Sequence, residues 1–377
     1  GIPCVTRGQV LADLFNSSKG IAVVGSHGKT TTTSIISHVL IQAGLDPTCM
    51  IGGVVDGYVS PFVSGQGEYM VAEGDESDGS FLSLQPYVAI VSNIDRDHLN
   101  NYDGSYEKLL DAFVQFLNSL PSDGIAILNI DDPGICSILP KLQCSLLTFG
   151  VSDKAGVRLL GYELNGMNSM FSVQSLYGKM EYELSLPGRH NIMNALASCA
   201  LTQFLALKVE MLYSALATFP GVGRRFQCRA RIALDEGEVL LIEDYGHHPR
   251  AIEAVIHAAR DAWPHGRLVM VFQPHRYSRT KDCLLEFVEV LSRVDCLVLL
   301  DVYSAGEDCE EGVQSIELYQ RLENNSLLEV YYVECLSRLP AFLSTIVRSD
   351  DIILLQGAGD IGSQASFIEG QLSSGVK

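Results

Sequence analysis

The stretch GIAVVGSHGKTTTT, residues 20–33, constrains the fold more than any other part of this chain. Its first five residues predict a short buried strand, and the pattern that follows predicts a helix over residues 30–43, ending at Gly44. A glycine-containing loop joins the two elements. Such a junction directs backbone N–H groups and the helix N-terminus toward an anion. The stretch therefore predicts an α/β sheet with an anion site at the end of one strand.

The spacing of this loop indicates a phosphate group as the anion. The usual pattern is G-x-x-x-x-G-K-[ST], whereas here only two residues separate Gly25 from Gly28. Lys29 can still reach terminal phosphates, and Thr30 can offer its hydroxyl to Mg²⁺. The alternative is a plain glycine turn with a threonine-rich helix cap. We favour a phosphate loop in which the following residues bind a phosphate-bearing cofactor: Gly25, Ser26, His27, Gly28, Lys29, Thr30 and Thr31.

Polar side chains follow three further hydrophobic stretches, which predict strands ending near Glu73, Asn93 and Asp131. In open parallel sheets, ligands bind at the carboxyl edge of the strands. Glu73 and His98, from the motifs EGDESD and NIDRDH, can therefore converge on Mg²⁺ or Mn²⁺ beside the phosphates. The alternative is that the first motif is a solvated acidic turn.

The pattern of predicted secondary structure changes twice after these strands. Residues 144–187 contain short strands separated by turn residues, which predict a small antiparallel sheet or β-rich insertion, and two helices follow. The segment PGVGRRF, residues 220–226, has the composition of a linker. Beyond it strands and helices alternate again, which predicts a second doubly wound unit.

Two groups of side chains suggest binding roles beyond the phosphate loop. His275, Arg276 and Arg279 follow a predicted strand, and arginines there can clamp a carboxylate or phosphate, although such clusters are often solvated surface. Asn191 and Asn194 begin a predicted helix on one face. They can cap that helix or hydrogen-bond to an adenine edge.

Composition narrows the functional class. A hydrophobic fraction of 47% in 377 residues suits two or three globular domains, and a net charge of −19 argues against non-specific binding to nucleic acid or anionic membranes. The ten cysteines form no C-x-x-C pair, which favours buried reduced thiols over a zinc site. No apolar run reaches membrane-spanning length and no signal peptide opens the chain, so we expect a cytoplasmic location.

The ordered motifs together resemble those of the Mur ligase family of peptidoglycan synthesis. The resemblance runs nearly end to end, through GSHGKTTTT, EGDESDGSFL, SNIDRDHLNNY, GRHNIMNALA, GVGRRFQ, EDYGHHP, FQPHRYSRT and QGAGDIG. It implies a P-loop-type parallel-sheet ATPase domain with a small β-rich insertion, followed by a Rossmann-like α/β domain. We expect the ATP-binding domain over residues 1–221, with a linker remnant at 1–19, and a domain that binds the amino-acid substrate over residues 222–377.

The resemblance also implies a reaction and a role for each motif. DYGHHP and PHRYSRT point to the alanine-adding branch, with ATP and Mg²⁺ as cofactors and UDP-N-acetylmuramate and L-alanine as substrates in cell wall biogenesis. The muramate carboxylate would attack the γ-phosphate, and the amine would attack the acyl phosphate. The catalytic set implied is Lys29, His98, Arg276 and Arg279. Thr30, Glu73 and His98 would bind metal; Asn191 would contact adenine; Arg225 and Asp244 would contact phosphates and ribose; Tyr245, His247, His275, Arg276 and Arg279 would frame the substrate carboxylates.

Two departures from the family pattern bear on these expectations. No lysine follows Lys108 in LLDAFVQFL, so we predict no carbamylated lysine. The start of the chain, GIPCVTRGQVLADLF, resembles the tail of the family's UDP-binding domain, so we expect that domain to be missing here. The alternatives are a non-catalytic nucleotide-binding fragment and a related ATP-dependent amide ligase, of the murein-peptide or folylpolyglutamate type.

Overall fold

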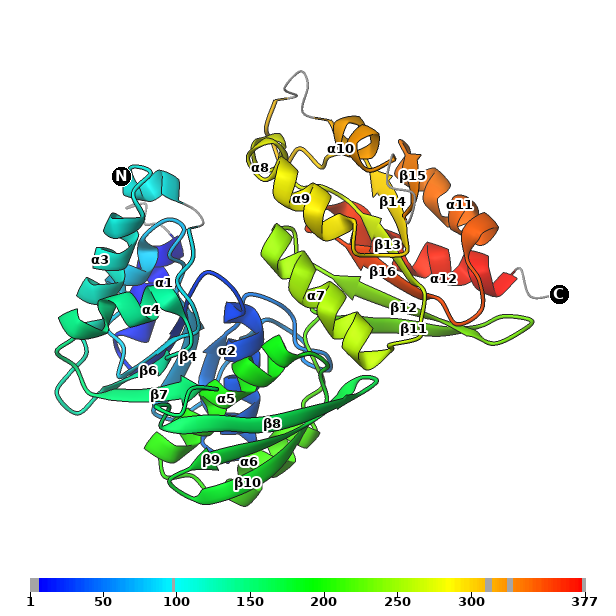
Figure 1. The fold of residues 1–377 in the computed structure, drawn as a ribbon. Helices are drawn as coiled ribbons and strands as arrows, with labels where there is room; N and C mark the ends of the chain where they lie inside the picture. The colour runs from blue at the N-terminus through cyan, green and yellow to red at the C-terminus, as the bar shows by residue number, and fades with distance from the viewer. Residues whose placement is uncertain (1–6, 97–98, 309–313, 324–327, 375–377) are drawn as a thin grey trace. The chain divides into compact units, whose positions relative to one another are not determined.

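The computed structural model describes residues 7–96, 99–308, 314–323 and 328–374. Contacts divide the chain into two compact units, residues 1–222 and 223–377, each with its own sheet (Figure 1). Within the described residues the first sheet has ten strands, in the order β10-β9-β8-β7-β6-β5-β1-β4-β2-β3. Their bounds are β1 (Lys19–Val24), β2 (Thr48–Met50), β3 (Phe62–Val63), β4 (Tyr69–Glu73), β5 (Val88–Val91), β6 (Ile125–Asn129), β7 (Leu146–Gly150), β8 (Val157–Asn165), β9 (Asn168–Ser175) and β10 (Gly178–Leu184).

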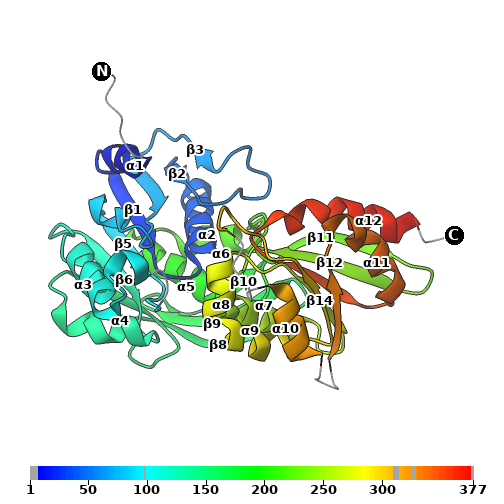
Figure 2. The same ribbon diagram turned by 90° about the horizontal axis from the view of Figure 1, so that it is seen from above.

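The core of the first sheet is parallel and covered by helices on both faces. β1 pairs in parallel with β4 and β5. Ile21 and Val23 lie in one buried cluster with side chains of α2, α5 and α6, whereas Ala22 and Val24 lie in another with side chains of α1, α3 and α4 (Figures 1 and 2). Burial on both faces explains the continuous apolar run of β1. The helices are α1 (Arg7–Phe15), α2 (Lys29–Gln42), α3 (Tyr106–Leu117), α4 (Pro133–Ile138), α5 (Arg189–Phe204) and α6 (Val209–Ala217).

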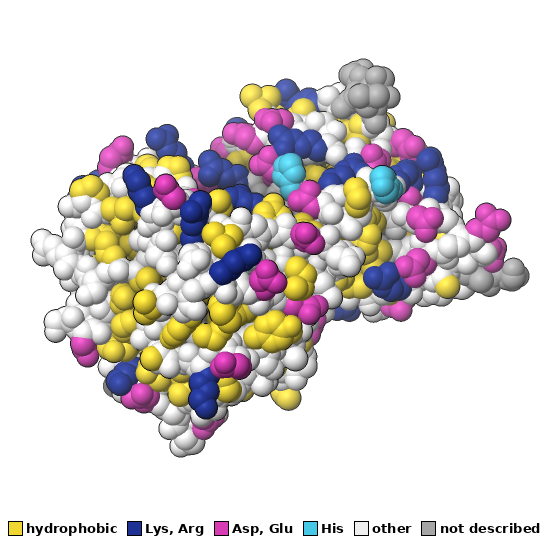
Figure 3. Space-filling model, turned by 60° about the horizontal axis from the view of Figure 1, so that its bottom comes forward, with side chains coloured by type: hydrophobic (Ala, Val, Ile, Leu, Met, Phe, Trp, Pro, Cys, Tyr) yellow, Lys and Arg dark blue, Asp and Glu magenta, His cyan; other side chains and the backbone are white. Residues whose placement is uncertain are grey.

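The region expected to be an insertion extends the main sheet. β7 pairs in parallel with β6 and with β8, and β8, β9 and β10 form an antiparallel meander at the edge of the same sheet. The outer strands carry exposed hydrophobic side chains at Leu160, Tyr162 and Met170. Figure 3 shows hydrophobic side chains scattered among polar ones over the viewed face of the first unit. Scattered exposure of this kind is ordinary for a globular surface.

The second unit is a separate six-stranded sheet within the described residues, in the order β11-β12-β16-β13-β14-β15. β11 is antiparallel to β12, and the other pairs are parallel. The strands are β11 (Gln227–Ala233), β12 (Glu238–Asp244), β13 (Leu268–Phe272), β14 (Cys296–Leu300), β15 (Glu329–Val333) and β16 (Ile352–Gln356). Leu339, Leu343 and Ile368 of α11 and α12 pack against one face of this sheet.

The helices of the second unit follow the expected alternation with one difference. They are α7 (Pro249–Ala262), α8 (Tyr277–Asp282), α9 (Leu284–Leu291), α10 (Ser315–Leu322), α11 (Leu339–Ile346) and α12 (Ala365–Ser374). The sequence KDCLLEFVEVLSRV, residues 281–294, has the pattern of one continuous helix, but the structure divides it at Cys283 between α8 and α9. The Thr280 hydroxyl donates to the Arg276 carbonyl four residues earlier, a contact that bends helices. No helix in the described parts of the chain has the length and apolarity to cross a bilayer.

Candidate active site

The phosphate loop, residues 25–30, runs from the end of β1 into the first two residues of α2 and depends on its two glycines. Gly25 and Gly28 have φ of 132° and 82°, a region that favours glycine. A Cβ at Gly28 would lie 2.6 Å from Oδ1 of Asn194, and one at Gly25 would lie 2.6 Å from Oγ of Ser92. The loop therefore needs glycine at both positions, for the turn itself and for its close approach to neighbouring side chains.

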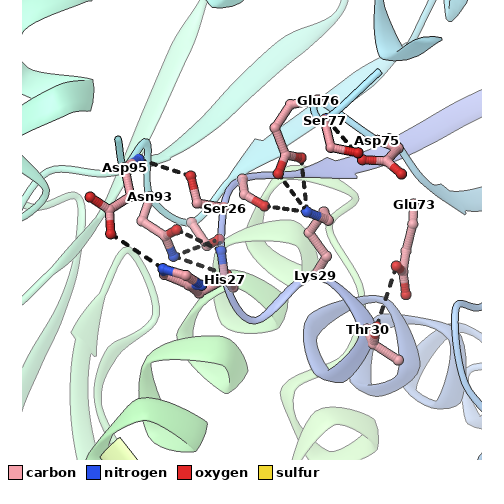
Figure 4. Close-up of polar contacts among 12 residues, drawn as sticks. Ser26, His27, Lys29, Thr30, Glu73, Asp75, Glu76, Ser77, Asn93 and Asp95 are labelled. Carbon is pink, nitrogen blue, oxygen red and sulfur yellow. Dashed lines mark hydrogen bonds and ion pairs between the residues drawn. The ribbon is translucent and has the colours of Figure 1, made fainter. Parts of the chain in front are cut away.

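Residues that follow β5 hold this loop from outside (Figure 4). The His27 N–H donates to Oδ1 of Asn93 over 2.8 Å, and the amide Nδ2 of Asn93 donates to the His27 carbonyl over 2.9 Å. The Asp95 N–H donates to Oγ of Ser26, and Oδ2 of Asp95 lies 3.3 Å from Nε2 of His27. Asn93 and Asp95 lie in the motif SNIDRDH, of which only the histidine was expected to have a role.

Lys29 is paired with a buried carboxylate that was not among the expected site residues. Its Nζ lies 2.8 Å from both carboxylate oxygens of Glu76 and 2.8 Å from the Gly25 carbonyl (Figure 4). Glu76 is 1% exposed, and its own carbonyl accepts from the Tyr102 hydroxyl. Burial raises the pKa of Glu76 above its ordinary value, and the nearby Lys29 ammonium opposes that rise.

Glu73 and Thr30 lie together beside the loop. Oγ1 of Thr30 donates to Oε2 of Glu73 over 3.3 Å, and Oε1 of Glu73 accepts from the Gly52 N–H over 2.8 Å. A hydroxyl and a carboxylate are the oxygen donors that Mg²⁺ prefers, so the pair fits a magnesium site. Among the described residues no group of three or more His, Cys, Asp or Glu is arranged to hold a metal. His98, the third ligand expected, lies outside the described residues.

The two asparagines at the start of α5 differ in their surroundings. Asn191 is 4% exposed, and its Nδ2 donates to the Pro187 carbonyl over 2.7 Å. Nδ2 of Asn194 lies 3.4 Å from Oδ1 of Asn191, and the Oδ1 of Asn194 lies beside Gly28. Asn194 therefore borders the phosphate loop directly, while the contact of Asn191 with adenine stays a prediction.

In the second unit, Asp244 and Arg225 lie near the linker. The Asp244 carboxylate is buried and accepts from the N–H groups of Phe226 and Gly246 and from Nε2 of Gln356. The Arg225 guanidinium lies 5.1 Å from the ring centroid of Tyr245, within cation–π range. The polar contacts of Asp244 hold the chain where β12 and β16 end, and its contact with ribose stays a prediction.

A row of rings and guanidinium groups follows β12 and β13. The His247 ring centroid lies 5.5 Å from those of both Tyr245 and His275, and His275 stacks on Tyr303. Nη1 of Arg279 lies 3.3 Å from the His275 carbonyl. This geometry brings together four of the five residues expected to frame the substrate carboxylates: Tyr245, His247, His275 and Arg279. Of the fifth, Arg276, the backbone N–H donates to the Tyr303 carbonyl over 2.8 Å. Tyr303, which follows β14, was not among the residues expected here.

The position of His247 leads to a pH prediction. Burial and the Arg279 guanidinium lower the pKa of His247 from 6.5 to about 3. Below pH 6.5 the unfolded chain then binds more protons at this residue than the folded chain, so this residue lowers stability as the pH falls from 6.5 toward 3. We expect its ring proton resonances to stay constant from pH 5 to pH 8 by NMR, assigned by their loss in His247→Gln. An inflection between pH 5.5 and pH 7.5 would contradict this assignment of charge.

The chain has two α/β units, a shortened phosphate loop with a lysine, and an arginine-bearing loop at the end of β13. These features together indicate an enzyme that binds phosphorylated ligands. The family model of the Mur ligase middle domain matches residues 23–202, and that of the Mur ligase glutamate ligase domain matches residues 224–359. The chain belongs to the Mur ligase family and is a ligase. The resemblance inferred from the motifs, and the fold class it implied, are confirmed.

Individual relatives agree with the family. The chain is 45% identical over 364 residues to the UDP-N-acetylmuramate–L-alanine ligase of Coxiella burnetii, covering 96% of this chain and 78% of that protein. The crystal structure of UDP-N-acetylmuramate–alanine ligase MurC from Thermotoga maritima has a TM-score of 0.82 at 27% identity, over 98% of this chain and 79% of that one. The MurF ligase of Thermotoga maritima, solved with ADP, shares the fold with a TM-score of 0.74 at 19% identity, over 99% and 84%.

Proposed function

We propose that this chain joins L-alanine to the carboxyl group of UDP-N-acetylmuramate, using ATP and Mg²⁺, as a step of peptidoglycan precursor synthesis. The carboxylate displaces ADP from the γ-phosphate and becomes an acyl phosphate. The amine of L-alanine then forms the amide bond, loses its proton and releases phosphate. The observation that carries the proposal is the phosphate loop, in which Lys29 lies against the Gly25 carbonyl and Thr30 contacts Glu73. The chain that contains this loop belongs to the Mur ligase family.

The first unit supplies the groups that a phosphoryl transfer needs. The loop backbone and the N-terminus of α2 provide N–H donors for phosphate oxygens, and the Lys29 ammonium adds a positive charge. Thr30 and Glu73 are the residues that would hold Mg²⁺, which when bound neutralises phosphate charge. The protein's contribution is positioning and charge neutralisation, since little covalent chemistry is asked of its side chains.

The second unit supplies groups suited to the carboxylates of the substrates. Arg276 and Arg279 carry planar guanidinium groups that can pair with a carboxylate through two parallel hydrogen bonds. The low pKa of His247 keeps its imidazole neutral at physiological pH, so it can accept a hydrogen bond without adding charge. These residues bind and orient the substrates in the proposal.

The choice of substrates rests on the motifs of the second unit and on the 45% identical relative. Its name gives the substrates directly, whereas a murein peptide ligase from Psychrobacter arcticus matches at only 20% identity, over 99% of this chain and 81% of that one, with a TM-score of 0.68. A likeness at that level reflects the shared fold. We place the reaction in the cytoplasm, because ATP is supplied there.

The test is phosphate release from ATP and Mg²⁺, with candidate acceptors and amino acids added singly and the product weighed by mass spectrometry. We expect release that requires both UDP-N-acetylmuramate and L-alanine, and a product heavier than the sugar nucleotide by one alanyl residue. Reactions without the sugar nucleotide, and with L-alanine replaced by D-alanine, serve as controls. Release with a murein peptide in place of L-alanine would favour that ligase type. Absence of release with every combination would favour a nucleotide-binding chain without catalysis.

A further inference from the structure

The three N–H donors of the Lys29 ammonium each have an acceptor within the first unit. Two are the carboxylate oxygens of Glu76 and the third is the Gly25 carbonyl, all at 2.8 Å. A lysine ammonium has three donors and no more. For Lys29 to donate to a phosphate oxygen, it must give up or share one of these contacts. The lysine that should bind phosphate is therefore already bound by a carboxylate.

The Glu76 carboxylate depends on Lys29 in turn, because it is buried and Lys29 is its ion-pair partner. Its side chain is 2% exposed, while that of Lys29 is 19% exposed. The backbone around it is held by two hydrogen bonds to its carbonyl, from the Tyr102 hydroxyl at 2.6 Å and from the Gly79 N–H at 3.2 Å. A buried carboxylate is costly unless it is paired. A nucleotide phosphate also offers anionic oxygens. Glu76 and a bound phosphate would therefore both accept hydrogen bonds from the same ammonium.

We propose that Glu76 competes with the β- and γ-phosphates of the nucleotide for the Lys29 ammonium, and so limits how tightly the phosphate loop holds ATP and ADP. Glu76 is a positioning residue in this scheme, because it acts through Lys29. The inference rests on the proposed function for the presence of a nucleotide at this loop. It gives Glu76 a role distinct from that of Glu73, which contacts Thr30 and not Lys29.

Glutamine at position 76 separates charge from shape. Glu76→Gln keeps the volume and one oxygen acceptor near Lys29 but removes the negative charge. A hydrogen bond from an ammonium to a carboxylate is stronger than one to a neutral amide oxygen, so the substitution weakens the competitor for Lys29. We therefore expect Glu76→Gln to bind ATP and ADP about tenfold more tightly than the wild-type chain does. AMP, which lacks the β- and γ-phosphates, should bind equally to both.

The experiment is isothermal titration calorimetry of ATP, ADP and AMP into the wild-type chain and Glu76→Gln. The matched control is Glu68→Gln in the same unit. Glu68 forms an exposed ion pair with Lys19, at 2.8 Å, and the substitution removes its carboxylate. A purely structural role for Glu76 would weaken all three nucleotides together. Tighter ATP and ADP with unchanged AMP supports competition, whereas unchanged or weaker ATP overturns it.

Two further variants guard the conclusion. If Glu76→Gln does not fold, as judged by circular dichroism and thermal unfolding, Glu76→Asp draws the carboxylate back from Lys29 without removing it, and should give a smaller tightening of the same sign. In a Lys29→Met background, Glu76→Gln should no longer change the ratio of ATP to AMP affinity, because the ammonium is gone. If the wild-type chain binds no ATP, the proposed function fails. If it binds ATP and the variants bind it no more tightly, only the competition fails.

Discussion

Lys29→Ala is expected to reduce ATP-dependent phosphate release on the order of 10³-fold, since removing one preorganised donor to a developing charge has an effect of this size. It should also destabilise the first unit, because Glu76 loses the ammonium that lies 2.8 Å from both its oxygens. Leaving a buried charge unpaired costs about 3–5 kcal/mol. Phosphate release at saturating substrates and the midpoint of thermal unfolding measure the two effects.

A double variant separates these two effects. Lys29→Ala combined with Glu76→Gln removes both partners, so the unfolding midpoint should return toward the wild-type value while turnover stays lost. Lys141→Ala is the matched control, because Lys141 is exposed and pairs with Asp111 far along the sequence from the loop. Wild-type turnover in Lys29→Ala would remove Lys29 from the phosphate site. Turnover recovered in the double variant would assign the loss to stability alone.

Arg279→Lys is expected to lower kcat/KM for the carboxylate substrates by about 10²-fold, the penalty for a small misplacement of a reactant. Lysine keeps the positive charge but loses the planar fork that binds both oxygens of a carboxylate. Nη1 of Arg279 also lies 3.3 Å from the His275 carbonyl, a contact that fixes the fork. Steady-state kinetics should show the loss in the parameters for UDP-N-acetylmuramate or L-alanine, with little change in KM for ATP.

The control for this variant is Arg321→Lys. Arg321 is an exposed residue of α10 whose Nη2 lies 3.1 Å from Oε1 of Glu317, so its substitution should leave all kinetic parameters near wild type. Wild-type kinetics in Arg279→Lys would argue against a carboxylate clamp at this position. A selective rise in KM for ATP would place Arg279 at the nucleotide.

The strands that the sequence predicts well are those buried on both faces. Residues 20–24 and 69–72 are continuous runs without a charged residue, and they lie in the central strands β1 and β4. β11 and β15 were not predicted, because they are edge strands with weaker patterns. β11, QCRARIA, carries arginines at exposed positions, and β15 is mostly half-buried. Edge strands bury less surface, so their hydrophobic period is less regular.

Some residues of the candidate site could be predicted from the sequence and others could not. The spacing G-x-x-G-K-T identified Lys29 and Thr30, because a phosphate loop is local in sequence. Glu76 could not be separated from its neighbours in GDESD, since Asp75 and Asp78 are exposed and only the fold buries Glu76 against Tyr102. Asn93 and Asp95 were visible as polar residues after a strand, but their contacts with the loop depend on the pairing of β1 with β5.

That dependence has a consequence for the order in which the first unit is built. The residues after β5 that contact the phosphate loop lie 65 to 69 positions further along the chain than their partners in the loop. The loop can take its final shape only after β5 has been made and has paired with β1, and contacts of such sequence separation form slowly. A nucleotide therefore cannot guide the earliest folding of a nascent chain. It can bind only when the sheet is already in place, and from then on it stabilises the folded state by mass action.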